Sequence, residues 1–126
     1  MSTVLIFDVD QTLGDEGELY EGVAELLTEL ATRGYLLYVC SLNPFAEHFL
    51  SRQGVRDLFQ GVIDVPWELS KAQTILNFIA NQLVQVHFFD DDPETIQEAL
   101  LAGIPSTLVP IGGVTKEVIE LGLNRG

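Results

Sequence analysis

The chain has 126 residues, the size of a single domain, and 47% of them are hydrophobic, which is enough for a core without covalent cross-links. Its 19 acidic and 6 basic residues give a formal net charge of −13, which argues against nucleic acid or an anionic membrane as a partner. The one cysteine, Cys40, excludes an internal disulfide.

The N-terminal residues lack the basic segment and long apolar run of a signal peptide. No stretch approaches the roughly 18 consecutive apolar residues of a membrane span. We therefore expect a cytoplasmic protein, with residues 1–126 forming one domain.

Short apolar runs alternate with helical patterns along the chain. The run from Thr3 to Phe7 is apolar and β-branched, which predicts a buried strand that ends at Asp8. Further strands are expected over Tyr35–Cys40, Gly61–Val65, Leu83–Phe89 and Ile104–Val109. Helices are expected over Gly22–Thr32, from Pro44 to about Gln53, from Ser70 to about Asn81, from Pro93 to Gly103 and from Thr115 onward, with a polar loop over Gly14–Tyr20.

This alternation predicts an α/β fold, a single-domain doubly wound parallel sheet of Rossmann-like type with helices on both faces. All of the expected connections are short, so we expect no inserted second domain.

Carboxylates gather where the expected strands end. Asp8 and Asp10 follow the first strand, and Asp90, Asp91 and Asp92 follow the fourth. In an open parallel sheet, the carboxyl ends of the strands form the rim where ligands bind. Carboxylates in so small a volume repel one another and take up protons unless a cation lies among them. We therefore expect these side chains to hold Mg²⁺, which prefers oxygen ligands.

Lys71 and Ser41 indicate an anion at the same rim. Lys71 lies in the first turn of a helix, after the expected N-cap Ser70, where the helix dipole disfavours a cation by ~0.3–1 kcal/mol unless an anion lies beside it. Ser41 and Leu42 begin a loop that leads to another helix N-terminus, and its hydroxyl and backbone N–H groups suit a phosphate. A carboxylate beside a metal and a phosphate can accept the phosphoryl group.

These residues resemble a known family. The segment FDVDQT, which begins at Phe7, resembles the DxDxT signature of the haloacid dehalogenase superfamily of phosphohydrolases. Ser41 and Lys71 stand where that family has a Ser/Thr and a lysine, and FFDDDP, which begins at Phe88, is similar to its acidic fourth motif. The four motifs follow the family's order over essentially the whole chain.

The resemblance implies a phosphatase with an aspartyl-phosphate intermediate. Asp8 would be the nucleophile and a Mg²⁺ ligand. Asp10 would act as general acid and then as base, with its backbone carbonyl on the metal. Asp91 would bind the metal directly, whereas Asp90 would support Lys71 or a metal-bound water.

The resemblance also implies a phosphate-binding set. Thr12, Ser41, Leu42 and Lys71 would form this set, and Thr12 would also help to position Asp10 and its loop. Gln11 departs from the family pattern, because many members have glycine there, and the segment SLNP matches the second motif loosely.

The spacing of the motifs is similar to that of capless members of the magnesium-dependent phosphatase type. The segments between Asp10 and Ser41 and between Gly54 and Lys71 are too short for a cap domain. An open site of this type accepts the accessible phosphate of a protein, a sugar or another metabolite. It also makes a homodimer reasonable, since such sites borrow a lid from another subunit.

Other interpretations remain open from the sequence. The chain can instead be a phosphate-binding protein or a receiver-like signalling domain without sustained turnover, although receivers carry their acceptor after the third strand. Asp92 is also explained as a helix N-cap. His48 and His87 are interpreted as structural residues, and Cys40 as a small buried side chain.

Overall fold

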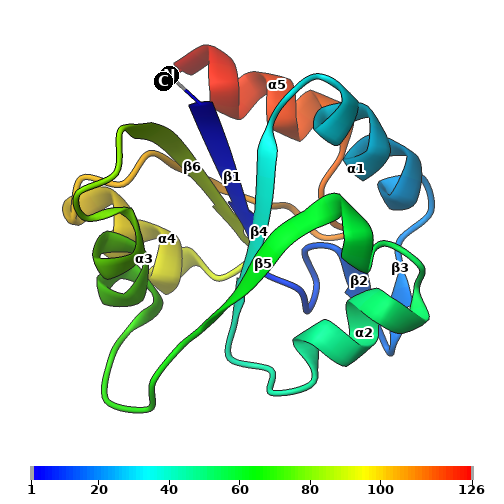
Figure 1. Cartoon of the computed structure of the whole chain (residues 1–126), viewed down its shortest axis with the longest axis horizontal. Coiled ribbons are helices and arrows are strands. Elements are labelled where there is room, and N and C mark those ends of the chain that lie inside the picture. Colours follow the sequence, from blue (N-terminus) through cyan, green and yellow to red (C-terminus); the bar gives the residue numbers. More distant parts are fainter. Residues whose placement is uncertain (1, 126) are drawn as a thin grey trace.

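The central sheet forms from the apolar runs of the chain. The computed structural model describes residues 2–125, and its five-stranded sheet has the order β5-β4-β1-β6-β7 with every neighbouring pair parallel (Figure 1). The strands are β1 (Ser2–Phe7), β4 (Leu36–Ser41), β5 (Phe59–Asp64), β6 (Val84–Asp90) and β7 (Ser106–Leu108). The predicted α/β fold with a doubly wound parallel sheet is therefore confirmed.

Helices cover both faces of this sheet. They are α1 (Val23–Thr32), α2 (Ala46–Arg52), α3 (Lys71–Ile79), α4 (Pro93–Leu101) and α5 (Lys116–Arg125). Helices α1, α2 and α5 contribute side chains to one apolar cluster, and α3 and α4 contribute to the other. Figure 1 shows α3 and α4 on the opposite side of the sheet from α1 and α5.

Strand β1 divides its side chains between the two clusters. Leu5 and Phe7 point to the face with α1, and Val4 and Ile6 point to the other, as the alternation of a strand requires. All four are at most 1% exposed. A strand buried on both faces is typical of the centre of a parallel sheet.

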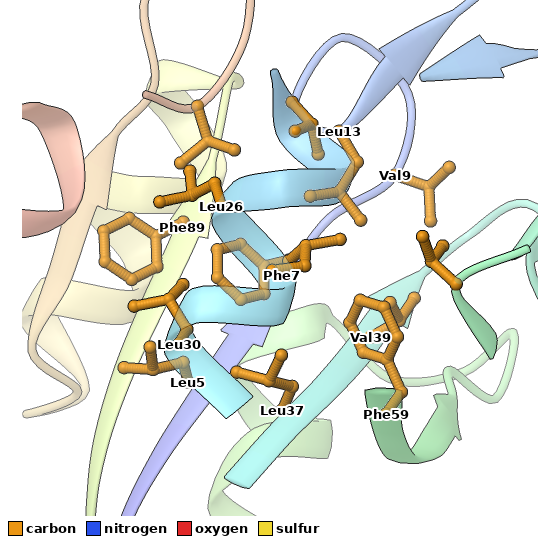
Figure 2. Close-up of a cluster of buried hydrophobic side chains, with 14 of the residues drawn as sticks. Leu5, Phe7, Val9, Leu13, Leu26, Leu30, Leu37, Val39, Phe59 and Phe89 are labelled. Atoms are coloured by element: carbon orange, nitrogen blue, oxygen red, sulfur yellow. The ribbon is translucent and has the colours of Figure 1, made fainter. Parts of the chain in front are cut away.

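The cluster beneath α1 centres on a pair of stacked rings. Phe7 and Phe89 lie on neighbouring strands with ring centroids 5.2 Å apart. Figure 2 shows Leu26 and Leu30 of α1 beside these two rings. Burying a side chain of this size stabilises the fold by about 1.5–3 kcal/mol, so this packing fixes β1 against β6.

Polar residues begin the two helices that lead away from the rim. Ser70 accepts a hydrogen bond from the backbone N–H of Gln73, whose side chain accepts one from the backbone N–H of Ser70, a reciprocal capping box. Asp92 caps α4, accepting hydrogen bonds from the backbone N–H of Glu94 and the hydroxyl of Thr95. The capping roles predicted for Ser70 and Asp92 are confirmed.

Two features differ from the sequence prediction. The segment expected as a polar loop contains a small antiparallel hairpin, β2 (Gly14–Asp15) and β3 (Glu18–Leu19). A single 3₁₀ turn, η1 (Arg56–Leu58), precedes β5. Both elements are too short to leave a periodic pattern in the sequence.

No inserted domain interrupts the described residues. The hairpin and α1 occupy the segment between Asp10 and Ser41, and a loop of six residues, 65–70, joins β5 to α3. None of the helices formed by residues 2–125 combines the length and hydropathy needed to cross a bilayer.

Cys40 and His87 are both buried, as small or structural core side chains would be. Cys40 is fully buried, and burial raises the pKa of its thiol to about 12, so it is the small core residue that was expected. His87 is 6% exposed, lies 2.7 Å from the Thr107 hydroxyl through Nε2 and packs on Phe89. It is therefore structural, also as expected.

Protonation of His87 should destabilise the fold. Burial lowers its pKa from 6.5 to about 4. Below pH 6.5 the His87 imidazole is protonated in the unfolded chain but stays neutral in the folded chain. The free energy of unfolding therefore decreases as the pH falls from 6.5 toward 4. Between pH 7.5 and 5, the wild type should lose about 2 kcal/mol more unfolding free energy than His87→Gln, measured by urea denaturation. Equal losses in the two proteins would contradict this assignment.

Candidate active site

The carboxyl ends of β1 and β6 bring two aspartates together. Phe7 pairs with Phe89 in the parallel register, and the backbone N–H of Asp8 donates to the Phe89 carbonyl at 3.0 Å. The next residues along the two strands, Asp8 and Asp90, therefore lie side by side. Asp8 is 6% exposed and Asp90 is 1% exposed.

Lys71 lies between these two carboxylates. Its Nζ is 2.8 Å from Oδ1 of Asp8 and 2.7 Å from Oδ2 of Asp90. Lys71 is the first residue of α3 and is itself 9% exposed. The anions that offset its place at a helix N-terminus are thus carboxylates of the same chain.

Burial sets the protonation of this group. Desolvation raises the pKa of Asp8 to about 7, because it outweighs the attraction of Lys71 and is reinforced by the charge of Asp90. Desolvation raises the pKa of Asp90 as well. Burial opposes the charge of Lys71, but the two carboxylates outweigh it and raise the pKa of its ammonium. One ammonium therefore does not fully stabilise the negative charge, and a second cation would.

Asp8, Asp90 and Asp91 form a set that fits such a cation. Each offers one carboxylate oxygen, and these oxygens lie within 4.8 Å of one another. The oxygens of Asp90 already accept from Lys71 Nζ and from the Asp92 backbone N–H, at 2.7 and 2.9 Å. An all-oxygen carboxylate set suits Mg²⁺.

A cavity of about 220 Å³ opens onto this group. Its lining includes all of the predicted site residues except Thr12, namely Asp8, Asp10, Ser41, Leu42, Lys71, Asp90 and Asp91. The structure thus brings together residues from the carboxyl ends of β1, β4 and β6 and from the start of α3, which lie far apart in the sequence. Thr12 is fully buried, and its hydroxyl has no hydrogen-bond partner among the described residues.

Asn43 connects Asp10 to the loop after β4. Its Nδ2 donates to Oδ2 of Asp10 at 3.3 Å, and its Oδ1 accepts from the backbone N–H of Phe45 at 2.9 Å. The hydroxyl oxygen of Ser41 accepts from the backbone N–H of Asn43 at 3.0 Å. Asp10 is exposed and lines the same cavity.

Sequence reasoning missed Asn43 and Thr95, which also line the cavity. Asn43 lies within the quoted segment SLNP, so its closeness to Ser41 was the available signal. Thr95 had no comparable signal, because it reaches the cavity from the first turn of α4.

Gln11 has a left-handed backbone, with φ of 64°. Glycine is the residue that adopts this conformation most easily, and many members of the resembled family have glycine here. The turn is held by the Gln11 N–H, which donates to the Gly14 carbonyl at 2.7 Å. The loop after Asp10 thus keeps a glycine-like backbone in spite of the substitution.

No protein-family model matches the chain. In sequence, it is 32% identical over 116 residues to a phosphoglycolate phosphatase of Synechococcus elongatus, in an alignment that covers 86% of this chain and 55% of that protein. The chain therefore spans about half the length of this curated relative.

Solved structures show the same fold. A haloacid dehalogenase-like hydrolase from Streptococcus pneumoniae superposes with a TM-score of 0.73 at 14% identity, over 94% of this chain and 90% of that one. A haloacid dehalogenase-superfamily hydrolase of subfamily IA from Geobacter sulfurreducens gives 0.71 at 14% identity, over 96% and 100%. The chain has the core fold of the haloacid dehalogenase superfamily, as its motifs predicted.

Removal of the Lys71 charge should destabilise the fold. Lys71→Met leaves Asp8 and Asp90 buried without their shared cation, and breaking a buried ion pair in this way costs about 3–5 kcal/mol. Urea denaturation at pH 8 without divalent cations measures the loss. Lys116→Met is the matched control, because Lys116 is half exposed and lies 3.5 Å from Glu29, so it should cost less than about 1 kcal/mol. Equal losses in the two variants would contradict the importance of this pair.

Proposed function

We propose that this chain is a Mg²⁺-dependent phosphomonoester hydrolase that forms an aspartyl-phosphate on Asp8. The observation that carries the proposal is the arrangement of one buried carboxylate, Asp8, beside Lys71 and two further carboxylates, in a cavity that is also lined by a fourth, exposed carboxyl group, that of Asp10. The sequence similarity to a phosphoglycolate phosphatase supports phosphatase activity.

Asp8 and Asp10 divide the chemistry. An oxygen of Asp8 attacks the phosphorus atom, and the bond from phosphorus to the leaving-group oxygen breaks while Asp10 donates a proton to that oxygen. Asp10 then removes a proton from a water molecule, which attacks the aspartyl-phosphate, so that inorganic phosphate leaves and Asp8 is regenerated. The link to Asn43 holds Asp10 at the mouth, where the leaving group departs.

The other polar groups bind and orient the phosphate. Lys71 and the loop that begins at Ser41 and Leu42 neutralise and position its oxygens, and Thr12 supports the loop that carries Asp10. Asp8 and Asp91 would hold Mg²⁺, with the backbone carbonyl of Asp10, while Asp90 keeps Lys71 in place. Bound there, Mg²⁺ would supply the charge neutralisation that allows the carboxylate to approach the phosphate.

The substrate is a phosphorylated small molecule or a phosphoprotein. Phosphoglycolate is the first compound to test, since a relative carries that name. The open site, the single domain over residues 1–126, the cytoplasmic location and a homodimer stay predictions, as does the absence of nucleic acid and membrane partners.

Asp8→Asn should abolish turnover and leave the fold intact, because the amide is not a nucleophile for this reaction. Phosphate release from an aryl phosphate, with Mg²⁺ and with EDTA, measures the effect.

Asp10→Asn should still bind a phosphate analogue such as fluoroberyllate, with turnover reduced at least about 100-fold by the loss of acid–base catalysis. Retained activity in Asp8→Asn would overturn the mechanism. A wild type that takes up phosphate once, without repeated release, would favour the receiver-like alternative.

Mg²⁺ should raise the melting temperature of the wild type by about 5 °C when it is well above its dissociation constant. Asp91→Asn should remove this shift, because it loses a metal ligand. Asp92→Asn is the matched control. It makes the same chemical change at the next residue, and asparagine still caps α4, so its shift should be that of the wild type. If Asp91→Asn and Asp92→Asn respond alike, Asp91 does not bind the metal.

A further inference from the structure

A second cavity adjoins the candidate active site. It has a volume of about 190 Å³ and lies between α2 and the β2–β3 hairpin, which Figure 1 shows beside each other. Asp10 and Asn43 line both cavities. The second cavity therefore includes the carboxyl group that we assign to leaving-group protonation, whereas Asp8 and Lys71 line the first cavity and not the second.

One face of α2 makes a wall with both charge and apolar surface. His48 and Arg52 are four residues apart, and side chains at this spacing lie on the same side of a helix. Phe45 and Phe49 line the same cavity one turn apart. Phe45 is 68% exposed, so most of this large apolar side chain lies outside the core.

Arg52 differs from Arg33, Arg56 and Lys116, each of which has an aromatic or a charged partner. Arg33 lies over the ring of Tyr35, Arg56 pairs with Glu47, and Lys116 pairs with Glu29. Among residues 2–124, Arg52 forms no ion pair within 4.0 Å. In a chain with a net charge of −13, it brings positive charge to the edge of the site.

Gln53, the residue that follows α2, joins this helix to the hairpin on the other side of the cavity. Its Oε1 accepts from the backbone N–H of Leu19, and its Nε2 donates to the carbonyl of Gly17, both at 3.1 Å. These two bonds fix the hairpin to the end of α2. The wall that carries Arg52 is therefore in a set position relative to Asp10.

We propose that the second cavity binds the leaving-group end of the substrate, and that this end carries a carboxylate that pairs with Arg52. The inference rests on the proposed phosphatase function, and it adds the substrate class. With the phosphate beside Asp8, the ester oxygen faces Asp10 and the rest of the molecule continues past Asn43 into the second cavity.

The side chains of Arg52 and His48 on this wall suit a carboxylate. A guanidinium binds a carboxylate through two parallel hydrogen bonds, and the imidazole of His48 adds a donor one turn earlier. The cavity is smaller than the roughly 300–1,000 Å³ of pockets for drug-sized ligands, so it suits an acid of a few heavy atoms, with Phe45 and Phe49 against its carbon atoms. The substrate is a small phosphorylated hydroxy acid.

Two esters that differ in one group test the inference. These are 2-phosphoglycolate and ethylene glycol monophosphate, in which a hydroxymethyl group replaces the carboxylate. The wild type should prefer the carboxylate ester by at least about tenfold in kcat/KM, as expected for a charged hydrogen-bonded pair. Arg52→Gln should bring this ratio close to one by raising KM for 2-phosphoglycolate, and Arg52→Lys should keep part of it.

Arg33→Gln is the matched control, because it removes the same charge from an arginine outside both cavities, and it should keep the wild-type ratio. A wild type that hydrolyses both esters equally well, or equal effects of Arg52→Gln and Arg33→Gln, would overturn the carboxylate subsite while the phosphatase function stands. Absence of phosphate release from both esters and from an aryl phosphate would instead overturn the proposed function, and the inference with it.

Discussion

The ion-pair arrangement of Lys71 with Asp8 and Asp90 is the interaction on which the candidate site depends. A parallel sheet places the carboxyl ends of its strands at one rim, so aspartates that follow neighbouring strands are forced together. Their repulsion and desolvation oppose folding unless positive charge lies between them. Lys71 supplies this charge from the first turn of α3, and its ammonium reaches both carboxylates. Helix, sheet and site are thus linked by a single side chain.

The rest of the site follows from strand order. Strand β1 lies between β4 and β6, so residues after all three strands face a common cavity. The buried rings of Phe7 and Phe89 hold β1 and β6 in the register that sets Asp8 beside Asp90. The apolar core therefore does more than stabilise the chain, because it fixes the spacing of the charged groups above it. A site built on strand ends is also more rigid than one built on loops alone.

The edge of the site is built differently from its centre. Asp10 is exposed, and it is positioned by Asn43 of the loop after β4. Beyond it, Gln53 joins the β2–β3 hairpin to α2 and so shapes a second cavity. The centre has the groups needed for phosphoryl transfer in general, whereas the edge has the groups that can distinguish one leaving group from another. No inserted domain covers either cavity within the described residues.

The sequence by itself determined the fold class, the strands and helices to within a few residues, and the motifs at Asp8, Ser41, Lys71 and Asp90, because burial and helix capping leave local patterns. Only the tertiary structure decided what depends on contacts between distant segments. It showed that Lys71 pairs with two carboxylates, that Thr12 is buried outside the cavity, and that Asn43 reaches Asp10. The hairpin and the cavity beside Arg52 were hidden for the same reason, since the bonds of Gln53 join residues that are 34 and 36 positions apart. Such contacts follow from packing, and no local pattern records them.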